Sequence, residues 1–532
     1  MSSSPRSLLK PIGAALMVLA LVAIAVVIVT QRDTSSGPGG EFVTRDGGQL
    51  MLDGEVFAYA GTNNYELMYQ GQPPVDAFMK TAADAEMTVI RTWAFFDVGT
   101  PSGDDGLNVE ISNKGTYFQY FDIEQGRPAY NDGADGLERL DYVIYSAKQH
   151  DLKLVLPLVN NWTAFGGVDQ YVRWADGEYH DDFLTDETIK QWYKDWVEHL
   201  LERENIFTGV KYKDEPAIMA WEIANELRCS DSGPYPSSEN CNPETMLAWA
   251  EEMSDHVRSI DSNHLIGFGG EGFLCTEPGG DYWLTNCGEA GDPAAILALP
   301  NIDLHGIHVY PNHWTPTEPT DDWADFGDWW IEEHGALADE YDKPFYIGEY
   351  GWLDKPTRLP LFNRWLETFH EAGGDGSHFW IMQPASSIGQ EPDAHGFTEK
   401  CPSAVCTVVT NWSLVMRDGA DWNDFGPVAS TNVTSTMIDV PTTLNIVDND
   451  MAFGDATLDL TSIDLDPETD GVQAEKTAKG GTFTVAADGS IEFVPAEGFY
   501  GSTRVDYTIS DSEGRASNVS RISAVVLKST EE

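Results

Sequence analysis

The chain has 532 residues, of which 42% are hydrophobic and 17 are Trp, so it can bury a large core and is not intrinsically disordered. This length predicts one large domain with a smaller second domain. Because 31 Lys and Arg stand against 87 Asp and Glu, the net charge of −56 would repel phosphate backbones, which excludes nucleic-acid binding. We expect salt to stabilise this acidic surface, as in proteins of saline habitats; an ordinary acidic secreted protein is the alternative.

The N-terminal segment has the composition of an export signal. Pro11 to Thr30 form a run of about 20 uncharged, mostly apolar residues after Arg6 and Lys10, which is long enough to cross a bilayer as a helix. Residues 1–30 are therefore a signal peptide or an N-terminal membrane anchor, and the lack of an A-x-A cleavage site favours the anchor. Residues 31–40 form a flexible linker. We expect an extracellular protein, secreted or anchored at the cell surface by this segment.

All six Cys follow that segment and fall into three pairs that are close in sequence. An oxidising compartment permits disulfides, and local pairing fits best, although six Cys allow fifteen connectivities. The C-x-x-C spacing of a zinc site is missing, which argues against structural zinc. The pairs are Cys229 with Cys241, Cys275 with Cys287, and Cys401 with Cys406.

Eight short, β-rich apolar runs recur between Val56 and Met382, and most are followed by a loop and a helical pattern. Several are apolar on both faces, as strands under helices must be, and Asp186 to Arg203 has the three- and four-residue apolar spacing of a helix. Eight such units predict an α/β fold, a (β/α)₈ TIM barrel over residues 41–426. The runs begin at Val56, Val89, Lys153, Ile218, Leu265, Leu304, Pro344 and Ser377.

Residues 427–532 are rich in Thr, Val, Asp and Gly and need no helix. Alternating apolar residues flank the turns at Asp488-Gly489 and Glu513-Gly514, which predicts β-hairpins. We expect this segment to form a small all-β sandwich of the immunoglobulin-like type.

Two carboxylates close predicted strands of the barrel, at the end where such folds hold their active sites. Glu226 follows the fourth strand in WEIANE, and Glu349 closes the seventh in FYIGEYG. Each could instead cap a helix or pair with an Arg. Two opposed carboxylates suggest glycoside hydrolysis, and a separation of about 5–5.5 Å would give net retention of configuration.

Other strand ends supply residues that could orient a nucleophile, hold a sugar hydroxyl or support a sugar ring. With the two Glu, this set resembles glycoside hydrolase family 5, a family of retaining barrel enzymes, over about residues 41–426. The resemblance implies Glu226 as acid/base, Glu349 as nucleophile and Asn225 as ligand of the substrate 2-hydroxyl. An acid needs a pKa raised toward the working pH, so we expect that of Glu226 to be raised by the charge on Glu349. The other residues of the set are Arg91, His308, Tyr310 and Trp380.

Longer motifs resemble the endo-β-1,4-mannanases of that family, namely GTNNYELMY, RTWAF, VNNWTAFGGVDQYVRWA and NIFTGVKYKDEPAIMAWEIANELRC. Asn160-Asn161-Trp162 stands where many family members carry a His, which is the mannanase pattern. The resemblance implies that Arg228 binds mannose on the leaving-group side and that the partner is a β-mannan polysaccharide. Trp162 is a candidate aromatic residue of the substrate cleft. Leu227 stands where relatives usually carry Pro, for which we expect a small loop change.

Some residues allow a second interpretation. His305 and His308 could suggest a metal, but we expect them on opposite strand faces and predict neither a metal nor a cofactor. Glu222 could be mistaken for the acid; we expect it to pair with a buried Arg or Lys inside the barrel. Further cleft candidates are Tyr171, Trp174, Trp314 and Trp352.

The preferred interpretation is that the chain is an exported, retaining endo-β-1,4-mannanase. The alternatives are a family 5 β-glucanase or cellulase, a mannan transglycosylase and a catalytically silent carbohydrate-binding adhesin. The C-terminal segment resembles CshA-like fibril repeats and immunoglobulin-like modules of bacterial surface proteins, for which a spacer or adhesive role is the default. We expect a monomer.

Overall fold

The computed structural model describes residues 41–101, 106–107, 115–229, 233–289, 291–314, 320–387 and 395–528. The predicted N-terminal helix and the linker lie outside these ranges. Within them, every helix is too short or too polar to cross a membrane.

The predicted barrel is confirmed. Eight parallel strands pair in the order β10-β9-β8-β5-β4-β13-β12-β11, and a parallel bridge between Gly267 and Leu304 joins the two outer strands. Each strand lies within or beside one of the eight predicted apolar runs. The strands are β4 (Tyr59–Asn63), β5 (Val89–Arg91), β8 (Lys153–Pro157), β9 (Ile218–Glu222), β10 (Leu265–Gly267), β11 (His305–Val309), β12 (Phe345–Tyr350) and β13 (Gly376–Phe379).

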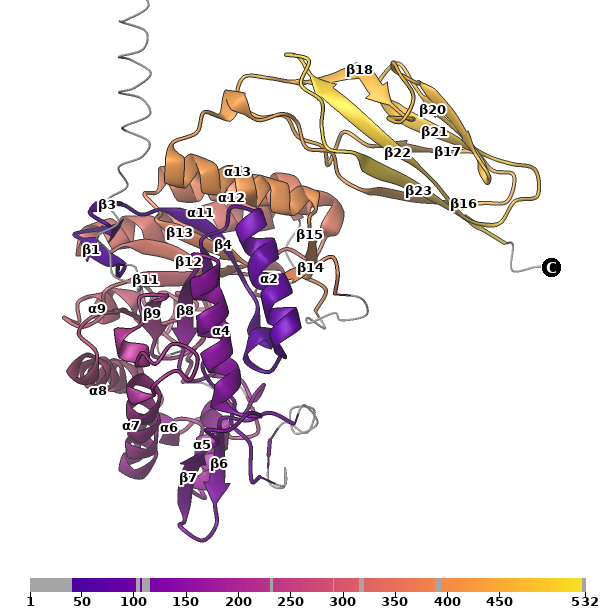
Figure 1. Cartoon of the computed structure of the whole chain (residues 1–532). Coiled ribbons are helices and arrows are strands. Elements are labelled where there is room, and N and C mark those ends of the chain that lie inside the picture. Colours follow the sequence, from indigo (N-terminus) through magenta and orange to yellow (C-terminus); the bar gives the residue numbers. More distant parts are fainter. Residues whose placement is uncertain are drawn as a thin grey trace, which may run out of the picture. The chain divides into compact units, whose positions relative to one another are not determined.

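A helix follows each strand, and these helices surround the strands (Figure 1). They are α2 (Gln72–Asp84), α4 (Leu137–Gln149), α7 (Glu187–Glu202), α8 (Pro243–Ile260), α9 (Pro293–Leu297), α11 (Thr320–Tyr341), α12 (Lys355–Glu371) and α13 (Ala404–Asp418). Three short helices extend the loops after β8 and β11: α5 (Gly167–Trp174), α6 (Asp182–Thr185) and α10 (Pro311–Trp314).

The local sequence explains these elements. Every residue of β9 is buried, as a strand enclosed by helices requires. The Asp186 side chain caps α7 by accepting hydrogen bonds from the backbone N–H groups of Thr188 and Ile189. The apolar face of α7, which includes Ile189 and Trp196, is buried at helical spacing.

The N-terminal ends of the strands enclose an apolar cluster that includes Tyr59, Val89, Leu265 and Leu304. Three short strands precede the barrel: β1 (Thr44–Asp46), β2 (Gln49–Leu52) and β3 (Glu55–Val56). Two small sheets lie in its loops, formed by β6 (Gln119–Asp122) with β7 (Arg127–Tyr130) and by β14 (Met382–Pro384) with β15 (Glu399–Cys401). Because apolar side chains fill the N-terminal end of the barrel, its polar side chains lie at the carboxyl ends of the strands.

The sequence-local disulfides are those expected, joining Cys229 to Cys241, Cys275 to Cys287 and Cys401 to Cys406.

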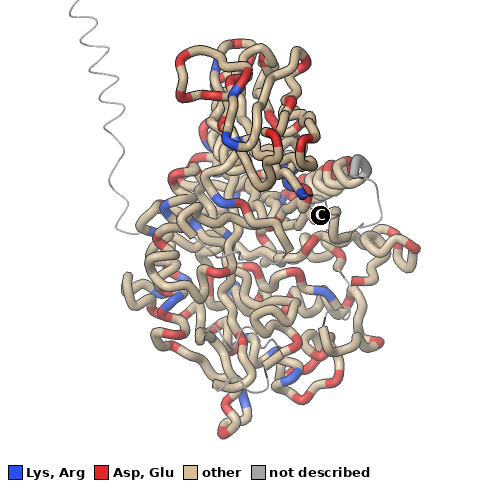
Figure 2. Tube along the Cα trace, turned by 90° about the vertical axis from the view of Figure 1, so that its right-hand side faces the viewer, with Lys and Arg blue, Asp and Glu red and all other residues tan. Residues whose placement is uncertain are grey.

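The C-terminal segment forms the predicted sandwich of two four-stranded sheets. Alternate residues of β21 are buried, and an antiparallel hairpin joins β20 to β21 through the turn at Asp488-Gly489. One sheet contains β16 (Asn432–Met437), β23 (Ser520–Leu527), β22 (Gly501–Asp511) and β18 (Leu458–Asp464). The other contains β17 (Thr442–Asn445), β21 (Ser490–Pro495), β20 (Gly481–Val485) and β19 (Glu475–Ala478). Figure 2 shows that acidic residues are spread along the described chain and outnumber basic ones.

Candidate active site

Arg91, the last residue of β5, is fully buried and organises the carboxyl ends of the strands. Its guanidinium donates to Glu222 at 2.7 Å, to Asn225 Oδ1 at 2.7 Å and to Glu349 Oε1 at 2.6 Å. A buried guanidinium satisfies several acceptors with fixed geometry, because its donors lie in one plane. Arg91 therefore fixes the side chains that follow β9 and end β12.

Glu226 and Glu349 face each other across this site. One carboxylate oxygen of each, together with one ring nitrogen of His308, all lie within 4.8 Å of one another. Glu349 also accepts a hydrogen bond from the Tyr310 hydroxyl at 2.8 Å. This spacing suits a pair in which one carboxyl group donates a proton to the glycosidic oxygen while the other attacks the anomeric carbon.

Glu226 has an unusual backbone conformation, with φ of +53° in the left-handed region. Non-glycine residues pay a conformational cost there, and such residues concentrate at functional sites. Its backbone N–H donates to the Gly269 carbonyl at 2.8 Å. Its carboxylate lies 2.6 Å from His308 Nδ1 and accepts from Trp162 Nε1 at 2.5 Å.

The protonation states of these groups depend on one another. Burial raises the pKa of Glu226, but the charge of His308 and the hydrogen bonds from His308 and Trp162 outweigh it and lower that pKa to about 2. Burial lowers the pKa of His308, but Glu349 and Glu226 raise it above the ordinary 6.5. Burial raises the pKa of Glu349 against the opposing charges of His308 and Arg91. The expected raised pKa of Glu226 is therefore wrong, because His308 and Trp162 lower it.

Asn225 precedes Glu226 and is held from two sides. Its Oδ1 accepts from Arg91, and its Nδ2 donates to Asn160 Oδ1 at 2.9 Å. Asn160 and Asn225 also form a parallel backbone bridge, which continues the pairing of β8 with β9 beyond the strand ends. The amide beside the two carboxylates is therefore fixed before any substrate binds.

The Arg228 side chain lies among aromatic rings and acidic groups. Its guanidinium carbon is 4.9 Å from the Trp162 ring centroid and 4.8 Å from that of Phe273. It donates two hydrogen bonds to Glu271, at 2.7 and 2.8 Å. Burial and the charge of Glu226 raise the pKa of Glu271 to about 7 against the opposing effect of Arg228.

Comparison with known proteins assigns the family. Residues 40–358 match the family model described as GH family 5 beta-mannosidase-like, which covers more than half of the chain. The chain belongs to glycoside hydrolase family 5. Residues 423–523 match a bacterial Ig domain model, in agreement with the sandwich.

Two curated relatives come from Aspergillus. A probable mannan endo-1,4-beta-mannosidase C from Aspergillus terreus is 37% identical over 339 residues, 60% of this chain and 75% of that protein. Mannan endo-1,4-beta-mannosidase F from Aspergillus fumigatus is 32% identical over 69% of this chain and 77% of its own length.

Solved structures agree with this assignment. The endo-1,4-beta-mannanase from Rhizomucor miehei is 36% identical and superposes with a TM-score of 0.64, covering 71% of this chain and all of its own. The endo-beta-1,4-mannanase from Thermotoga petrophila is 28% identical with a TM-score of 0.63, covering 90% of this chain and all of its own. The family 5 hydrolase fold therefore extends over the part of the chain that carries the site.

Aromatic rings form one rim of this family 5 site. Trp380, which follows β13, is partly exposed, and its ring stacks against Tyr65 with centroids 5.7 Å apart. Trp93 lies 5.8 Å from Trp380 on another side. The other predicted cleft aromatics are buried and pack into the core cluster: Tyr171, Trp174, Trp314 and Trp352.

The two histidines of β11 point to opposite faces, as expected. His308 contacts Glu226, whereas His305 lies 3.0 Å from His334 Nδ1 on α11. Glu222 is fully buried and pairs with Arg91, as predicted, and also accepts from the Tyr346 hydroxyl at 2.5 Å. The Glu222 carboxylate is therefore already bonded to neighbouring side chains inside the barrel.

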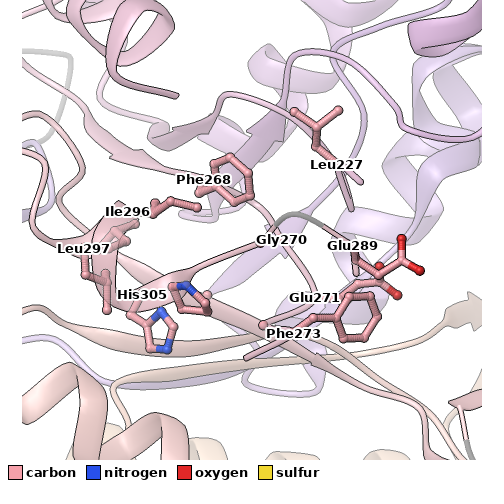
Figure 3. A pocket seen from close by; sticks show the side chains of 14 residues that line it. Leu227, Phe268, Gly270, Glu271, Phe273, Glu289, Ile296, Leu297 and His305 are labelled. Carbon is pink, nitrogen blue, oxygen red and sulfur yellow. The ribbon is translucent and has the colours of Figure 1, made fainter. Parts of the chain in front are cut away.

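A narrow recess lies beside the site, and neither of the two catalytic candidates lines it. Figure 3 shows Glu271 and Glu289 at one end and Ile296, Leu297 and His305 at the other. Leu227, the residue in the usual Pro position, also lines it. Its two carboxylates, Glu271 and Glu289, both lie against Arg228, so the recess does not hold the Glu226–Glu349 pair that family 5 chemistry needs.

Two polar residues of the site were not predicted. Asn63 ends β4, accepts from Arg91 at 3.3 Å and donates to the Gly348 carbonyl at 2.9 Å. Glu271, the partner of Arg228, follows the fifth strand in LIGFGGEG. Both follow apolar runs at strand ends, the same signal that identified Glu226 and Glu349.

Proposed function

We propose that the chain is a retaining endo-β-1,4-mannanase that hydrolyses internal β-1,4-mannosidic bonds of mannans such as galactomannan and glucomannan. The observation that carries this proposal is the pairing of Glu226 with Glu349, whose facing oxygens lie within 4.8 Å. Membership of family 5, with curated relatives named as mannan endo-1,4-beta-mannosidases, supports mannan as the substrate class.

In this mechanism Glu349 is the nucleophile. Its carboxylate is held by Arg91 at 2.6 Å and by Tyr310 at 2.8 Å, which orients it toward the anomeric carbon. It displaces the leaving sugar oxygen and forms a glycosyl–enzyme ester on one of its oxygens. Water then hydrolyses this ester, and the two inversions give net retention.

Glu226 is the acid in the first step and the base in the second. His308 Nδ1, 2.6 Å from its carboxylate, is placed to pass a proton to Glu226 as the glycosidic oxygen approaches. The leaving oxygen takes that proton when its bond to the anomeric carbon breaks. In the second step Glu226 accepts a proton from the attacking water, and the hydrogen bond between His308 and Glu226 again stabilises the carboxyl group.

Specificity for mannose depends on contacts to its axial 2-hydroxyl. Asn225, fixed by Arg91 and Asn160, is the proposed ligand of that hydroxyl. Trp380 is the proposed platform for the sugar ring, and Trp162 and Arg228 bind the sugar on the leaving-group side.

Reducing-sugar release from galactomannan and carboxymethylcellulose tests this function. We expect rapid release from galactomannan and little from carboxymethylcellulose. Preferential release from carboxymethylcellulose would identify a glucanase, longer products without net reducing-sugar release would indicate a transglycosylase, and binding without turnover would indicate an adhesin.

We further propose that the enzyme is exported. The apolar run from Pro11 to Thr30 and the three disulfides both fit an oxidising compartment outside the cytosol. Anchoring by that run predicts that the full chain sediments with membranes, whereas cleavage near residue 30 predicts free protein in the medium.

A further inference from the structure

A buried histidine–carboxylate pair next to the site takes no part in the mechanism above. Asp169 lies on α5, and His180 lies between α5 and α6. Both are almost fully buried, and His180 Nδ1 is 2.6 Å from Asp169 Oδ1. Neither residue contacts Glu226 or Glu349.

The other ring nitrogen of His180 is directed at the backbone of Arg228. His180 Nε2 lies 3.2 Å from the Arg228 carbonyl oxygen and 3.3 Å from Asn161 Oδ1. The same Asn161 oxygen accepts the Arg228 backbone N–H at 3.0 Å. His180 therefore contacts the Arg228 carbonyl directly and the Arg228 N–H through Asn161.

The segment around His180 also holds the far end of the loop that carries Arg228. The His180 backbone N–H donates to the Pro236 carbonyl at 2.9 Å, and Asp181 accepts from the Ser238 backbone N–H at 2.6 Å. Between these points, Gly233 packs directly on Asp169, because a Cβ there would lie 2.0 Å from Asp169 Oδ2. The loop is therefore fixed near its start, middle and end.

We propose that Asp169 and His180 form a brace that positions Arg228 and so determines how strongly the enzyme binds the sugar on the leaving-group side. This inference rests on the proposed function. Glu226 is held independently, by His308, Trp162 and the Gly269 carbonyl. Loosening the brace therefore moves Arg228 while the reacting carboxylates keep their positions. His180 is a positioning residue and does not touch the reacting atoms.

The test compares two substrates in one variant. Mannohexaose places sugars on both sides of the cleaved bond, whereas a dinitrophenyl β-mannobioside has no sugar on the leaving-group side. We expect His180→Gln to lower kcat/KM on mannohexaose by about tenfold or more, mainly through KM, and on the aryl substrate by less than about threefold. The control is His199→Gln, since His199 lies on α7 and its side chain contacts Asp132, away from the described residues of the Arg228 loop. This variant should change both values by less than about twofold.

Gly233→Ala should disturb the brace from the loop side, because its methyl group would collide with Asp169. We expect this variant to show the same selective loss. It decides the question if His180→Gln does not fold. Equal losses on both substrates, or no loss in either variant, would overturn the brace. If the wild-type enzyme cleaves neither mannan substrate, the proposed function fails instead, and the same comparison with cellohexaose and an aryl cellobioside then judges the brace.

Discussion

The barrel and the sandwich use their buried interiors differently. The carboxyl ends of the barrel strands bury an ionised cluster of Arg91, Glu222 and Glu349. The sandwich core is built from apolar side chains, including Phe483 and Phe493, whose ring centroids are 4.6 Å apart. Burying a charge is costly unless the charge is paired, and clusters of buried charges are common at functional sites. The comparison places the chemistry in the barrel.

The two regions also differ in their aromatic residues. All 17 Trp lie at or before Trp422, so none belongs to the sandwich segment. Tryptophan fluorescence therefore reports mainly on the barrel, although the Trp422 ring stacks on Phe453 with centroids 5.4 Å apart.

The largest predicted effect comes from the nucleophile. Glu349→Ala should lower kcat on galactomannan by about 10⁴-fold or more, because the variant loses the group that forms the covalent intermediate. Circular dichroism should remain native. Glu340→Ala, which changes an exposed glutamate on α11, should keep its activity.

Chemical rescue sharpens this prediction. Azide added to Glu349→Ala should attack an activated β-mannoside from the vacated side and give an α-mannosyl azide, the inverted product. A β-mannosyl azide would remove Glu349 from the nucleophile role.

The acid/base should show a smaller and substrate-dependent effect. Glu226→Gln should slow mannan cleavage by about 10³-fold, because the natural leaving oxygen needs a proton. Glycosylation by a dinitrophenyl mannoside should fall by less than about tenfold, since that leaving group departs unprotonated. Pre-steady-state release of dinitrophenol measures this step, and equal losses on both substrates would contradict the assignment.

The eight strands could be predicted because each is a buried apolar run, and the paired Glu residues because each ends such a run. The directions of the pKa shifts of Glu226 and His308 could not be predicted from the sequence. They depend on His308 lying 2.6 Å from Glu226, although 82 residues separate the two. The Asp169–His180 brace was missed for the same reason, since its contacts to Asn161 and Arg228 leave no local pattern. Burial of Tyr171 and Trp352 depends on tertiary packing that residue type does not reveal.

Acidification should affect the two regions in opposite directions through two particular residues. Burial lowers the pKa of His305 to about 3, so below pH 6.5 the unfolded chain binds a proton that the folded barrel refuses, and stability falls. Burial raises the pKa of Asp450 to about 7, so the folded sandwich keeps a proton that the unfolded chain loses above pH 3.8, and stability rises on acidification. Between pH 7 and 5 each contributes about 2 kcal/mol.

Denaturant unfolding of variants measures these contributions. Relative to the wild type, His305→Gln should lose less barrel stability on acidification, as followed by tryptophan fluorescence. Asp450→Asn should gain less sandwich stability, as followed by tyrosine fluorescence of an isolated fragment of residues 427–532, which contains Tyr500 and Tyr507 and no Trp. Unchanged pH dependence in either variant would contradict the corresponding assignment.

The smallest predicted effect is that of removing the sandwich. Truncation after Gly426 should change kcat/KM on soluble galactomannan by less than about twofold, because all eight barrel strands and all proposed catalytic residues precede it. Activity on insoluble mannan should fall if the sandwich binds or orients the enzyme on the matrix. Loss on both substrates, with exposed apolar surface detected by dye binding, would show that the two regions fold as one.

The most direct test of the central claim is the anomeric configuration of the first product. Proton NMR during rapid cleavage of mannohexaose should show the β-anomer of the new reducing end first, with the α-anomer growing later by mutarotation. Initial appearance of the α-anomer would mean inversion and would contradict double displacement by Glu226 and Glu349.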